Sequence, residues 1–461
     1  MGGLIQLVAY GEQDVVLTGN PKVTFFQAVY KRHTNFAMET IQQTTNGQLG
    51  TAPVQNNARI TVVVARNGDL IGQTYLELQA NTVYLGNTWS GYSTTVGTLD
   101  GMAWMAERAI SDIELTIGGQ KIDKHYQRWW RLYSELYLDE AKKIQYGKMT
   151  SNPNSSLLGL SSSTGAGVTV SGQVFLPLLF FFNRNPGLFL PLIALQYHEV
   201  RLDFDISQEF SAYFNPSYFK VWSNYVYLDN EERQMFAQKG HEYLIEQLQY
   251  TGSASLPATI GNTNFTRITF NHPVKELVWC VTQNSSGGKQ LWDFTDDASN
   301  TNCVIITTNT SNTFNSSNCY VPISYSTGTP VQWFGAPYNT TTQWIEDGNS
   351  VGTSYGPVQD FKLIINGQDR MKAQSGKYYN QVQPFYHHSG NPYPGIYSYS
   401  FALKPEEHQP SGTCNFSRVD NSQAAITLKS GVSPNSVLEI YAVNYNVLRI
   451  QSGMGGLAFS N

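Results

Sequence analysis

The 461-residue chain has little charge. Lys, Arg, Asp and Glu make up 14% of it, where soluble proteins average about 25%. The formal net charge is −5, and no segment gathers the Lys and Arg residues that a protein needs to neutralise many phosphates. We therefore expect no direct nucleic-acid binding.

Cysteines are also few, and they are widely spaced. The four are Cys280, Cys303, Cys319 and Cys414, with no C-x-x-C pair among them. This spacing gives no zinc signal and suits reduced thiols in a cytosolic compartment. The first residues lack a basic stretch followed by an apolar one, so we expect no secretory signal peptide.

The usual catalytic motifs are missing. The sequence contains neither G-x-S-x-G nor a phosphate-binding G-x-x-x-x-G-K-[ST] loop. His198-Glu199 begins like a zinc-protease motif, but Leu202 stands where the second His belongs. His387 and His388 are adjacent, and neighbours on a strand point to opposite faces. We predict no enzyme, and no catalytic, metal-binding or cofactor-binding residues.

No apolar run is long enough to span a membrane without interruption. Residues 174–195 come nearest, but residues 183–187 (NRNPG), Pro177 and Pro191 break the segment. We expect two buried segments around a tight turn, in a soluble protein.

Strand patterns are abundant. In residues 200–206 the apolar side chains alternate with charged ones, as in a half-buried antiparallel strand. Residues 436–450 predict another strand, and Asn67-Gly68 between two β-rich runs suits a type I′ turn. Helices are few: one amphipathic helix over residues 123–137, and one that Asp229 opens with Glu232 three residues later.

Two short segments recur near half the chain length. Residues 113–120 (IELTIGGQ) are echoed at 361–368 (FKLIINGQ), and residues 224–228 (NYVYL) at 444–448 (NYNVL). Together they favour two copies of one β domain.

Long polar loops separate these segments, at residues 81–101, 147–172 and 284–356. Of seven N-x-[ST] sequons, four are candidate glycosylation sites, although a chain rich in Asn, Ser and Thr produces sequons by chance: Asn284, Asn309, Asn315 and Asn339. An alternative function, a glycan-binding β-sandwich attachment protein, would use exposed aromatic residues in these loops: Trp89, Tyr92, Trp333 and Trp344.

The stretch 19–36 (GNPKVTFFQAVYKRHTNF) surrounds apolar residues with Lys22, Lys31, Arg32 and His33. It could be a basic patch for nucleic acid or phosphate, a catalytic His with cationic helpers, or a strand that carries charge. The Gly-Asn-Pro turn and the β-branched and aromatic residues after it favour the strand.

Segments spread over most of the chain resemble the major capsid proteins of nucleocytoplasmic large DNA viruses, the group of iridoviruses and phycodnaviruses. They are residues 18–40, 66–78, 190–206, 225–249 and 370–388.

The resemblance implies an all-β fold of two tandem eight-stranded antiparallel jelly rolls, with a few short helices and long loops. It implies a structural major capsid protein that forms homotrimeric, pseudo-hexagonal capsomers of an icosahedral shell. The expected partners are other copies of the chain, minor capsid and penton proteins and inner viral membrane proteins, in a virion assembled in the host cytoplasm. The expected divisions are an arm (1–20), a first jelly roll (21–228), a linker (229–242), a second jelly roll (243–455) and a tail (456–461).

On this reading residues 19–36 lead into the first jelly roll, and Phe25-Phe26 anchor the arm in the core. Lys31, Arg32 and His33 would lie at a strand end and contact a neighbouring chain or a minor capsid protein.

Overall fold

The computed structural model divides into two compact units, Met1–Phe36 and Ala37–Asn461. It describes residues 20–21, 24, 26–28, 30–50, 58–80, 104–150, 172–208, 210–257, 262–283, 323–326, 329–333, 355–392, 395–429 and 435–459. Among these residues, no helix has both the length and the apolar character needed to cross a lipid bilayer.

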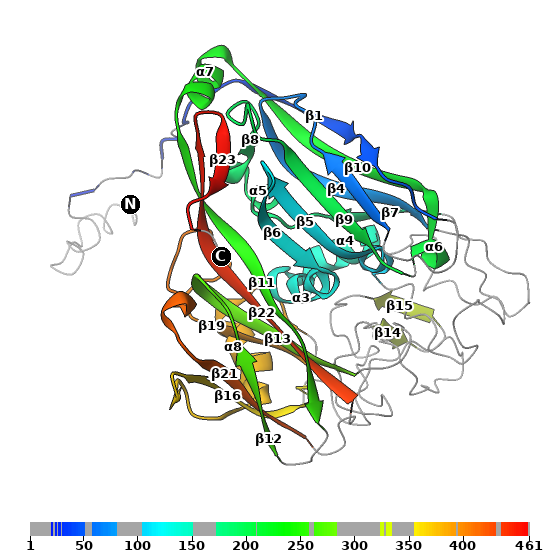
Figure 1. Cartoon of the computed structure of the whole chain (residues 1–461), viewed down its shortest axis with the longest axis vertical. Helices are drawn as coiled ribbons and strands as arrows, with labels where there is room; N and C mark the ends of the chain where they lie inside the picture. Colours follow the sequence, from blue (N-terminus) through cyan, green and yellow to red (C-terminus); the bar gives the residue numbers. More distant parts are fainter. Residues whose placement is uncertain are drawn as a thin grey trace, which may run out of the picture. The chain divides into compact units, whose positions relative to one another are not determined.

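The strands of the first half form two sheets (Figure 1). One has the order β1 (Phe36–Gln43), β10 (Phe214–Leu228), β4 (Leu70–Ala80), β7 (Gln173–Pro177), with β8 (Leu190–Pro191) also paired to β4. The other has the order β2 (Thr45–Asn46), β3 (Arg59–Val63), β9 (Val200–Ile206), β5 (Ile110–Ile117), β6 (Gln120–Tyr126).

The strands of the second half form a corresponding pair of sheets. One has the order β11 (His241–Pro257), β22 (Asn435–Gln451), β13 (Pro273–Gln283), β19 (Ile396–Ser400), extended by β20 (Cys414–Asn415) and β23 (Met454–Leu457). The other has the order β12 (Thr263–Ile268), β21 (Ser422–Leu428), β16 (Val358–Ile365), β17 (Gln368–Asp369), with β18 (Gln374–Ser375) on β16. A separate pair joins β14 (Ile323–Ser326) to β15 (Thr329–Trp333).

The strand order is the same in both halves. The eight main strands of the first half are, in chain order, β1, β3, β4, β5, β6, β7, β9 and β10, and those of the second half are β11, β12, β13, β16, β17, β19, β21 and β22. Numbered one to eight in this order, both halves have sheets ordered 1-8-3-6 and 2-7-4-5. Each half is therefore an eight-stranded jelly roll, which confirms the predicted fold class. The two sequence echoes fall on matching strands, β5 with β16 and β10 with β22. The predicted limits of each division remain predictions.

The helices among the described residues are short and lie between strands. They are η2 (Met105–Arg108), α3 (Gln127–Tyr137), α4 (Glu140–Thr150), α5 (Phe181–Arg184), η3 (Pro186–Leu188), α6 (Phe210–Tyr213), α7 (Asn230–Gln238), η4 (Tyr378–Val382), α8 (Gln383–His387) and η5 (Phe416–Arg418). Asp229 caps α7, as predicted, by accepting a hydrogen bond from the backbone N–H of Asn230. The predicted start of the first helix is wrong, because residues 120–126 pair with β5 as a strand before α3 begins.

The predicted turn at Asn67-Gly68 is also wrong. The strands on either side, β3 and β4, belong to different sheets, and neither turn residue has a positive φ. The glycine at position 68 has a different explanation, because a Cβ there would lie 2.9 Å from Cβ of Tyr225. Close packing, rather than a tight turn, requires the glycine.

The N-terminal stretch does not form the expected strand from its start, since β1 begins only at Phe36. Phe26 is exposed within the N-terminal unit and Phe25 lies outside the described residues, so the predicted anchoring of Phe25-Phe26 stays a prediction. The alternating segment 200–206 forms β9, as predicted, with all four of its apolar side chains buried.

The hydrophobic core runs through both jelly rolls. On β13, Leu277, Trp279 and Val281 belong to the second jelly roll's own core. Val278 and Cys280 instead belong to the larger core that contains the first jelly roll. A strand buried on both faces is apolar nearly throughout, and β13 is such a strand.

Candidate assembly site at the junction of the jelly rolls

Helix α3 lies beside the strands of the second jelly roll (Figure 1), and aromatic side chains of α3 and of the preceding strand end contact them. The ring of Trp129 lies 5.9 Å from that of Tyr441 on β22, and Tyr126 lies 4.7 Å from Tyr250 on β11. Tyr250 and Tyr441 stack on each other at 4.7 Å. Burial raises the pKa of the Tyr441 hydroxyl well above its usual value, so this side chain stays neutral. The amphipathic pattern predicted for this region is therefore used at the junction.

Strand β6 contributes polar contacts beside this aromatic cluster. The Asp123 carboxylate accepts a 2.9 Å hydrogen bond from the backbone N–H of Leu248. The Gln247 side chain donates to the backbone carbonyl of Ile122. These bonds align the edge of one jelly roll with the first sheet of the other.

Ion pairs with buried carboxylates cross the same junction. Arg128 of α3 contacts Glu439 at 2.8 Å, and Arg184 of α5 contacts Glu246 at 3.0 Å. Lys275 reaches the other oxygen of Glu246 at 2.7 Å. Burial raises the pKa of Glu246, but the positive charges of Arg184 and Lys275 lower it by more. The pKa therefore lies below its usual value, and this carboxylate stays ionised. Removing one partner from such a set leaves a buried charge uncompensated.

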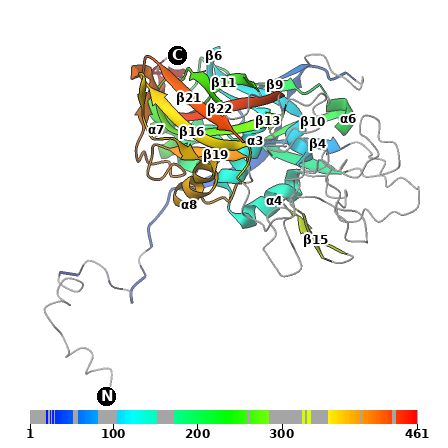
Figure 2. The ribbon, with the colours of Figure 1, turned by 90° about the horizontal axis from the view of Figure 1, so that it is seen from below.

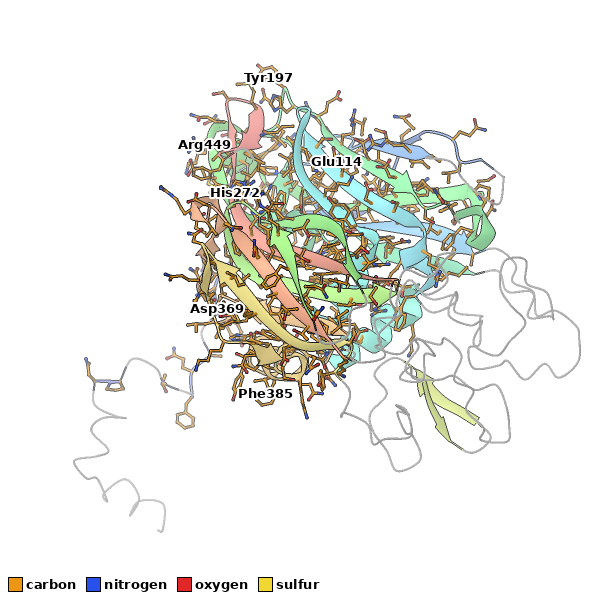
Figure 3. The ribbon with its side chains drawn as sticks, turned by 60° about the horizontal axis from the view of Figure 1, so that its bottom comes forward. Glu114, Tyr197, His272, Asp369, Phe385 and Arg449 are labelled. Carbon is orange, nitrogen blue, oxygen red and sulfur yellow. The ribbon has the colours of Figure 1, made fainter. Side chains whose placement is uncertain are left out.

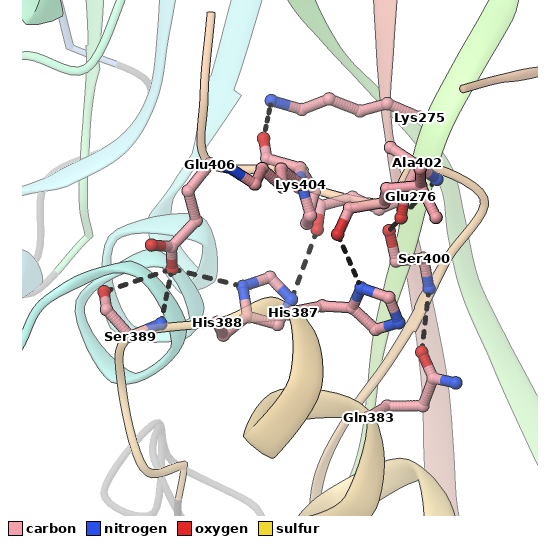
Figure 4. A network of polar contacts seen from close by, with 12 residues as sticks. Lys275, Glu276, Gln383, His387, His388, Ser389, Ser400, Ala402, Lys404 and Glu406 are labelled. Atoms are coloured by element: carbon pink, nitrogen blue, oxygen red, sulfur yellow. Dashed lines mark hydrogen bonds and ion pairs between the residues drawn. The ribbon is translucent and has the colours of Figure 1, made fainter. Parts of the chain in front are cut away.

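A buried histidine in contact with two carboxyl groups lies next to these ion pairs (Figure 4). His388 contacts Glu276 at 3.3 Å through Nε2 and Glu406 at 3.4 Å through Nδ1. Burial, with repulsion from Glu406, holds the pKa of Glu276 well above its usual value, and burial lowers the pKa of His388. Both shifts favour a protonated Glu276 beside a neutral imidazole, with Glu406 as the ionised carboxylate.

The segment after His388 rests on the C-terminal end of α3. The backbone N–H of Gly390 donates to the carbonyl of Leu136 at 2.9 Å, and the Ser389 hydroxyl donates to the carbonyl of Tyr137 at 3.1 Å. A Cβ on Gly390 would lie 2.2 Å from the carbonyl oxygen of Glu135. Only glycine permits this approach.

The C-terminal hairpin, formed by β22 and β23, packs the second jelly roll against the first. The backbone N–H of Tyr197 donates to the carbonyl of Gly453 at 3.0 Å, and His198 Nδ1 lies 2.8 Å from the carbonyl oxygen of Gly455. The N–H of Leu457 donates to the Gln120 side chain at 3.2 Å. His198, which begins an incomplete zinc motif, thus has a structural role.

The junction as a whole fixes one jelly roll against the other through packing, ion pairs and backbone bonds. In the part of the chain that the structure describes, no group of three or more His, Cys, Asp or Glu side chains is arranged to hold a metal ion. The arrangement suits a rigid building block.

The residues predicted to contact a neighbouring chain or a minor capsid protein belong to the N-terminal unit. Lys31, Arg32 and His33 are exposed in the N-terminal unit. His387 ends α8 and His388 follows it, so this pair is not on a strand as assumed.

Several other predicted residues fall outside the described residues. They are the candidate glycosylation sites Asn284, Asn309, Asn315 and Asn339, and the aromatic residues Trp89, Tyr92 and Trp344. Trp333 ends β15.

Sequence reasoning missed the buried charges of the junction. A signal was present, because Lys275-Glu276 interrupts an apolar strand run at residues 274–281. Charges in such a run are seldom fully buried without partners, but the partners come from distant segments.

Comparison with known proteins agrees with this architecture. Family models match residues 24–229, as the N-terminal part of a major capsid protein, and residues 232–456, as a large eukaryotic DNA virus major capsid protein. The chain is 39% identical to the major capsid protein of Paramecium bursaria Chlorella virus 1 and 38% identical to that of Phaeocystis pouchetii virus, over the full length of each chain.

Solved structures agree as well. The chain matches the quasi-atomic model of the Paramecium bursaria Chlorella virus 1 capsid with a TM-score of 0.68 and 35% identity, covering 95% of this chain and 100% of that one. The Faustovirus major capsid protein, at 14% identity and a TM-score of 0.61, shares the fold. The chain therefore belongs to the major capsid protein family of large eukaryotic DNA viruses.

Proposed function

We propose that three copies of this capsid protein close into a trimer with a pseudo-hexagonal outline, which tiles the icosahedral shell of the virion. The observation that carries this proposal is the shared strand order of the two halves. Three chains around a threefold axis present six similar wedges, and such a ring packs hexagonally with one gene product. The comparisons give no support to the glycan-binding alternative.

The rigid junction supports the same proposal. A trimer has six equivalent corners only if each chain holds its two jelly rolls at a constant angle. The ion pairs, the aromatic cluster and the C-terminal hairpin each resist a change of that angle. The protein acts in this proposal as a structural part without enzymatic activity.

Further partners are part of the proposal. Neighbouring capsomers, minor capsid proteins, penton proteins and inner viral membrane proteins would contact the trimer during assembly in the host cytoplasm. The net charge of −5 supports a shell protein that does not bind the genome directly. Lys31, Arg32 and His33 would contact a neighbouring chain or a minor capsid protein, and their exposure in the N-terminal unit is compatible with that role.

The native mass of the purified protein tests the trimer. Three copies of the 51.5 kDa chain have a mass of 154.5 kDa, which light scattering or native mass spectrometry resolves from the single chain. A stable 51.5 kDa species at micromolar concentration would contradict the proposal. Images of a trimer viewed along its axis should have six corners.

A further inference from the structure

Within one chain, the first jelly roll covers the outer face of the second jelly roll's first sheet. The side chains of Glu276, Val278 and Cys280 on that face are completely buried. The covering elements are β6 and two helices, α3 and α5. By strand position, α3 lies between the fifth and sixth main strands of its jelly roll, and α5 between the sixth and seventh.

The corresponding face of the first jelly roll lies on β1, β10, β4 and β7, and we call it the first-sheet face. Tyr75, Phe175 and Trp222 are only half-buried on it. The rings of Tyr75 and Phe175 meet edge to face at 6.0 Å. Glu77 accepts hydrogen bonds from the Tyr218 hydroxyl at 2.8 Å and from the Trp222 indole N–H at 2.5 Å.

These contacts hold the aromatic side chains in place before any partner arrives. Ordered, half-exposed Tyr, Trp and Phe side chains are typical of the energetic centre of a protein interface. The first-sheet face therefore has the character of an interface that is not completed within the chain.

The second jelly roll carries the counterparts of α3 and α5 at the same strand positions. η4 and α8 lie between its fifth and sixth main strands, and residues 401–413 lie between its sixth and seventh. Figure 2 shows α8 beside β19. These counterparts expose apolar side chains where α3 and α5 bury theirs, and we call the set the α8 patch: Val382 (40% exposed), Phe385 (80%), Tyr386 (71%) and Leu403 (75%). Figure 3 shows Phe385 at the surface.

We propose that the α8 patch of one chain covers the first-sheet face of the next chain in the trimer. The contact repeats between chains the arrangement that already joins the two jelly rolls within a chain. It is head-to-tail, because patch and face are different surfaces, and a head-to-tail contact closes into a ring when its rotation matches the symmetry. The proposal rests on the trimer proposed above and names its interface.

Large exposed apolar groups on a monomer mark interaction sites, and the fold repeat identifies the occupant as a second copy of the chain. Any other partner would have to reproduce the surface of a jelly roll that each chain already carries.

A charge placed in the α8 patch tests this interface. Phe385→Asp and Tyr386→Asp, alone and together, should convert the 154.5 kDa species to the 51.5 kDa chain and weaken association at least tenfold. Because both side chains are largely exposed, circular dichroism and thermal unfolding of the variants should match the wild type. The matched control is Phe265→Asp on β12, where the side chain is 62% exposed outside the patch, and it should remain a trimer.

The opposite surface is tested by Phe175→Asp, which should also give the single chain. Mixing this variant with Phe385→Asp leaves one intact patch and one intact face. A head-to-tail contact then yields a species of two chains, 103 kDa, that cannot close into a ring.

Folded patch variants that remain trimers would overturn the inference and leave the proposed trimer standing. A wild-type protein that stays a single chain would overturn the proposed trimer itself, and the inference with it.

Discussion

Glu276 and His388 illustrate how burial sets the charge of single residues in this protein. Both side chains are inaccessible to solvent, and they contact each other at 3.3 Å. Isolated ionised groups are costly to bury, so such groups change their protonation instead. Here the raised pKa of Glu276 and the lowered pKa of His388 place the proton on the carboxyl group.

This assignment predicts the pH dependence of stability in Glu276→Gln. A carboxyl group with a raised pKa contributes stability that is fully present below its usual value of 4.5 and is lost as the pH rises through the raised pKa. Gln mimics the protonated group at every pH. The free energy of unfolding of the variant, relative to that of the wild type, should therefore increase as the pH rises from 5 to 8, by at most about 1.4 kcal/mol per pH unit. Denaturant unfolding of both proteins at each pH measures this difference.

His388 acts in the opposite direction in both proteins. Its lowered pKa contributes stability above 6.5 that is lost as the pH falls through the lowered value, and the comparison of the two proteins cancels this effect to first order. Glu242→Gln is the control, because Glu242 pairs with Arg449 on the surface with 62% and 55% of their side chains exposed. A difference between Glu276→Gln and the wild type that stays constant with pH would show that Glu276 is ionised throughout.

At the scale of elements, the two jelly rolls share a hairpin that has diverged at one position. Gly118-Gly119 joins β5 to β6, and Asn366-Gly367 joins β16 to β17, all four with positive φ. Asn tolerates this backbone conformation, and Asn366 uses its side chain to accept hydrogen bonds from the backbone of Asp420 and Asn421. Gly118 has no such freedom, because a Cβ there would lie 2.2 Å from the ring of His198.

Gly118→Asn should therefore destabilise the protein although it restores the turn sequence of the other jelly roll. The new side chain displaces His198 and weakens its contact with Gly455 in the C-terminal hairpin. We expect a loss of about 2–3 kcal/mol, as for overpacking in a filled site, in equilibrium unfolding by urea.

Gly119→Asn is the matched control. Its φ of +81° carries a similar backbone cost, but no atom lies within 4 Å of the position of a Cβ. Equal losses in the two variants would mean that the turn backbone, and not His198, decides the choice of glycine.

At the scale of the whole molecule, assembly depends on surfaces that are exposed in the single chain. The N-terminal unit carries Lys31, Arg32 and His33 in exposed positions. Their proposed contact with a neighbouring chain or a minor capsid protein is independent of the α8 patch, so the two can be separated by experiment.

Arg32→Glu should impair shell assembly and leave the isolated protein folded. The charge reversal turns an attraction into a repulsion at the contact, while an exposed residue contributes little to folding, usually within about 0.5 kcal/mol. Assembly is measured by electron microscopy of expressed shells, and folding by thermal unfolding. Arg418→Glu, at the end of η5 in the second jelly roll, serves as a surface control, and shells of normal yield from Arg32→Glu would refute the contact.

Much of the fold could be predicted because its signals are local. The alternation in residues 200–206 and the cap at Asp229 depend on neighbouring residues, and each half-chain echo compares two short stretches of sequence. The structure bears them out. The errors came from tertiary effects. Asn67-Gly68 connects two different sheets, and residues 120–126 pair with β5 as a strand, where the start of a helix was predicted.

The sequence by itself determined that the chain forms two copies of one β domain, because strand periodicity and internal repeats are properties of the chain's order. Only the tertiary structure decided how the copies are joined. The partners of Glu246, Glu276 and His198 come from segments far away in sequence. Their energies depend on burial and distance, which exist only once the sheets have packed together.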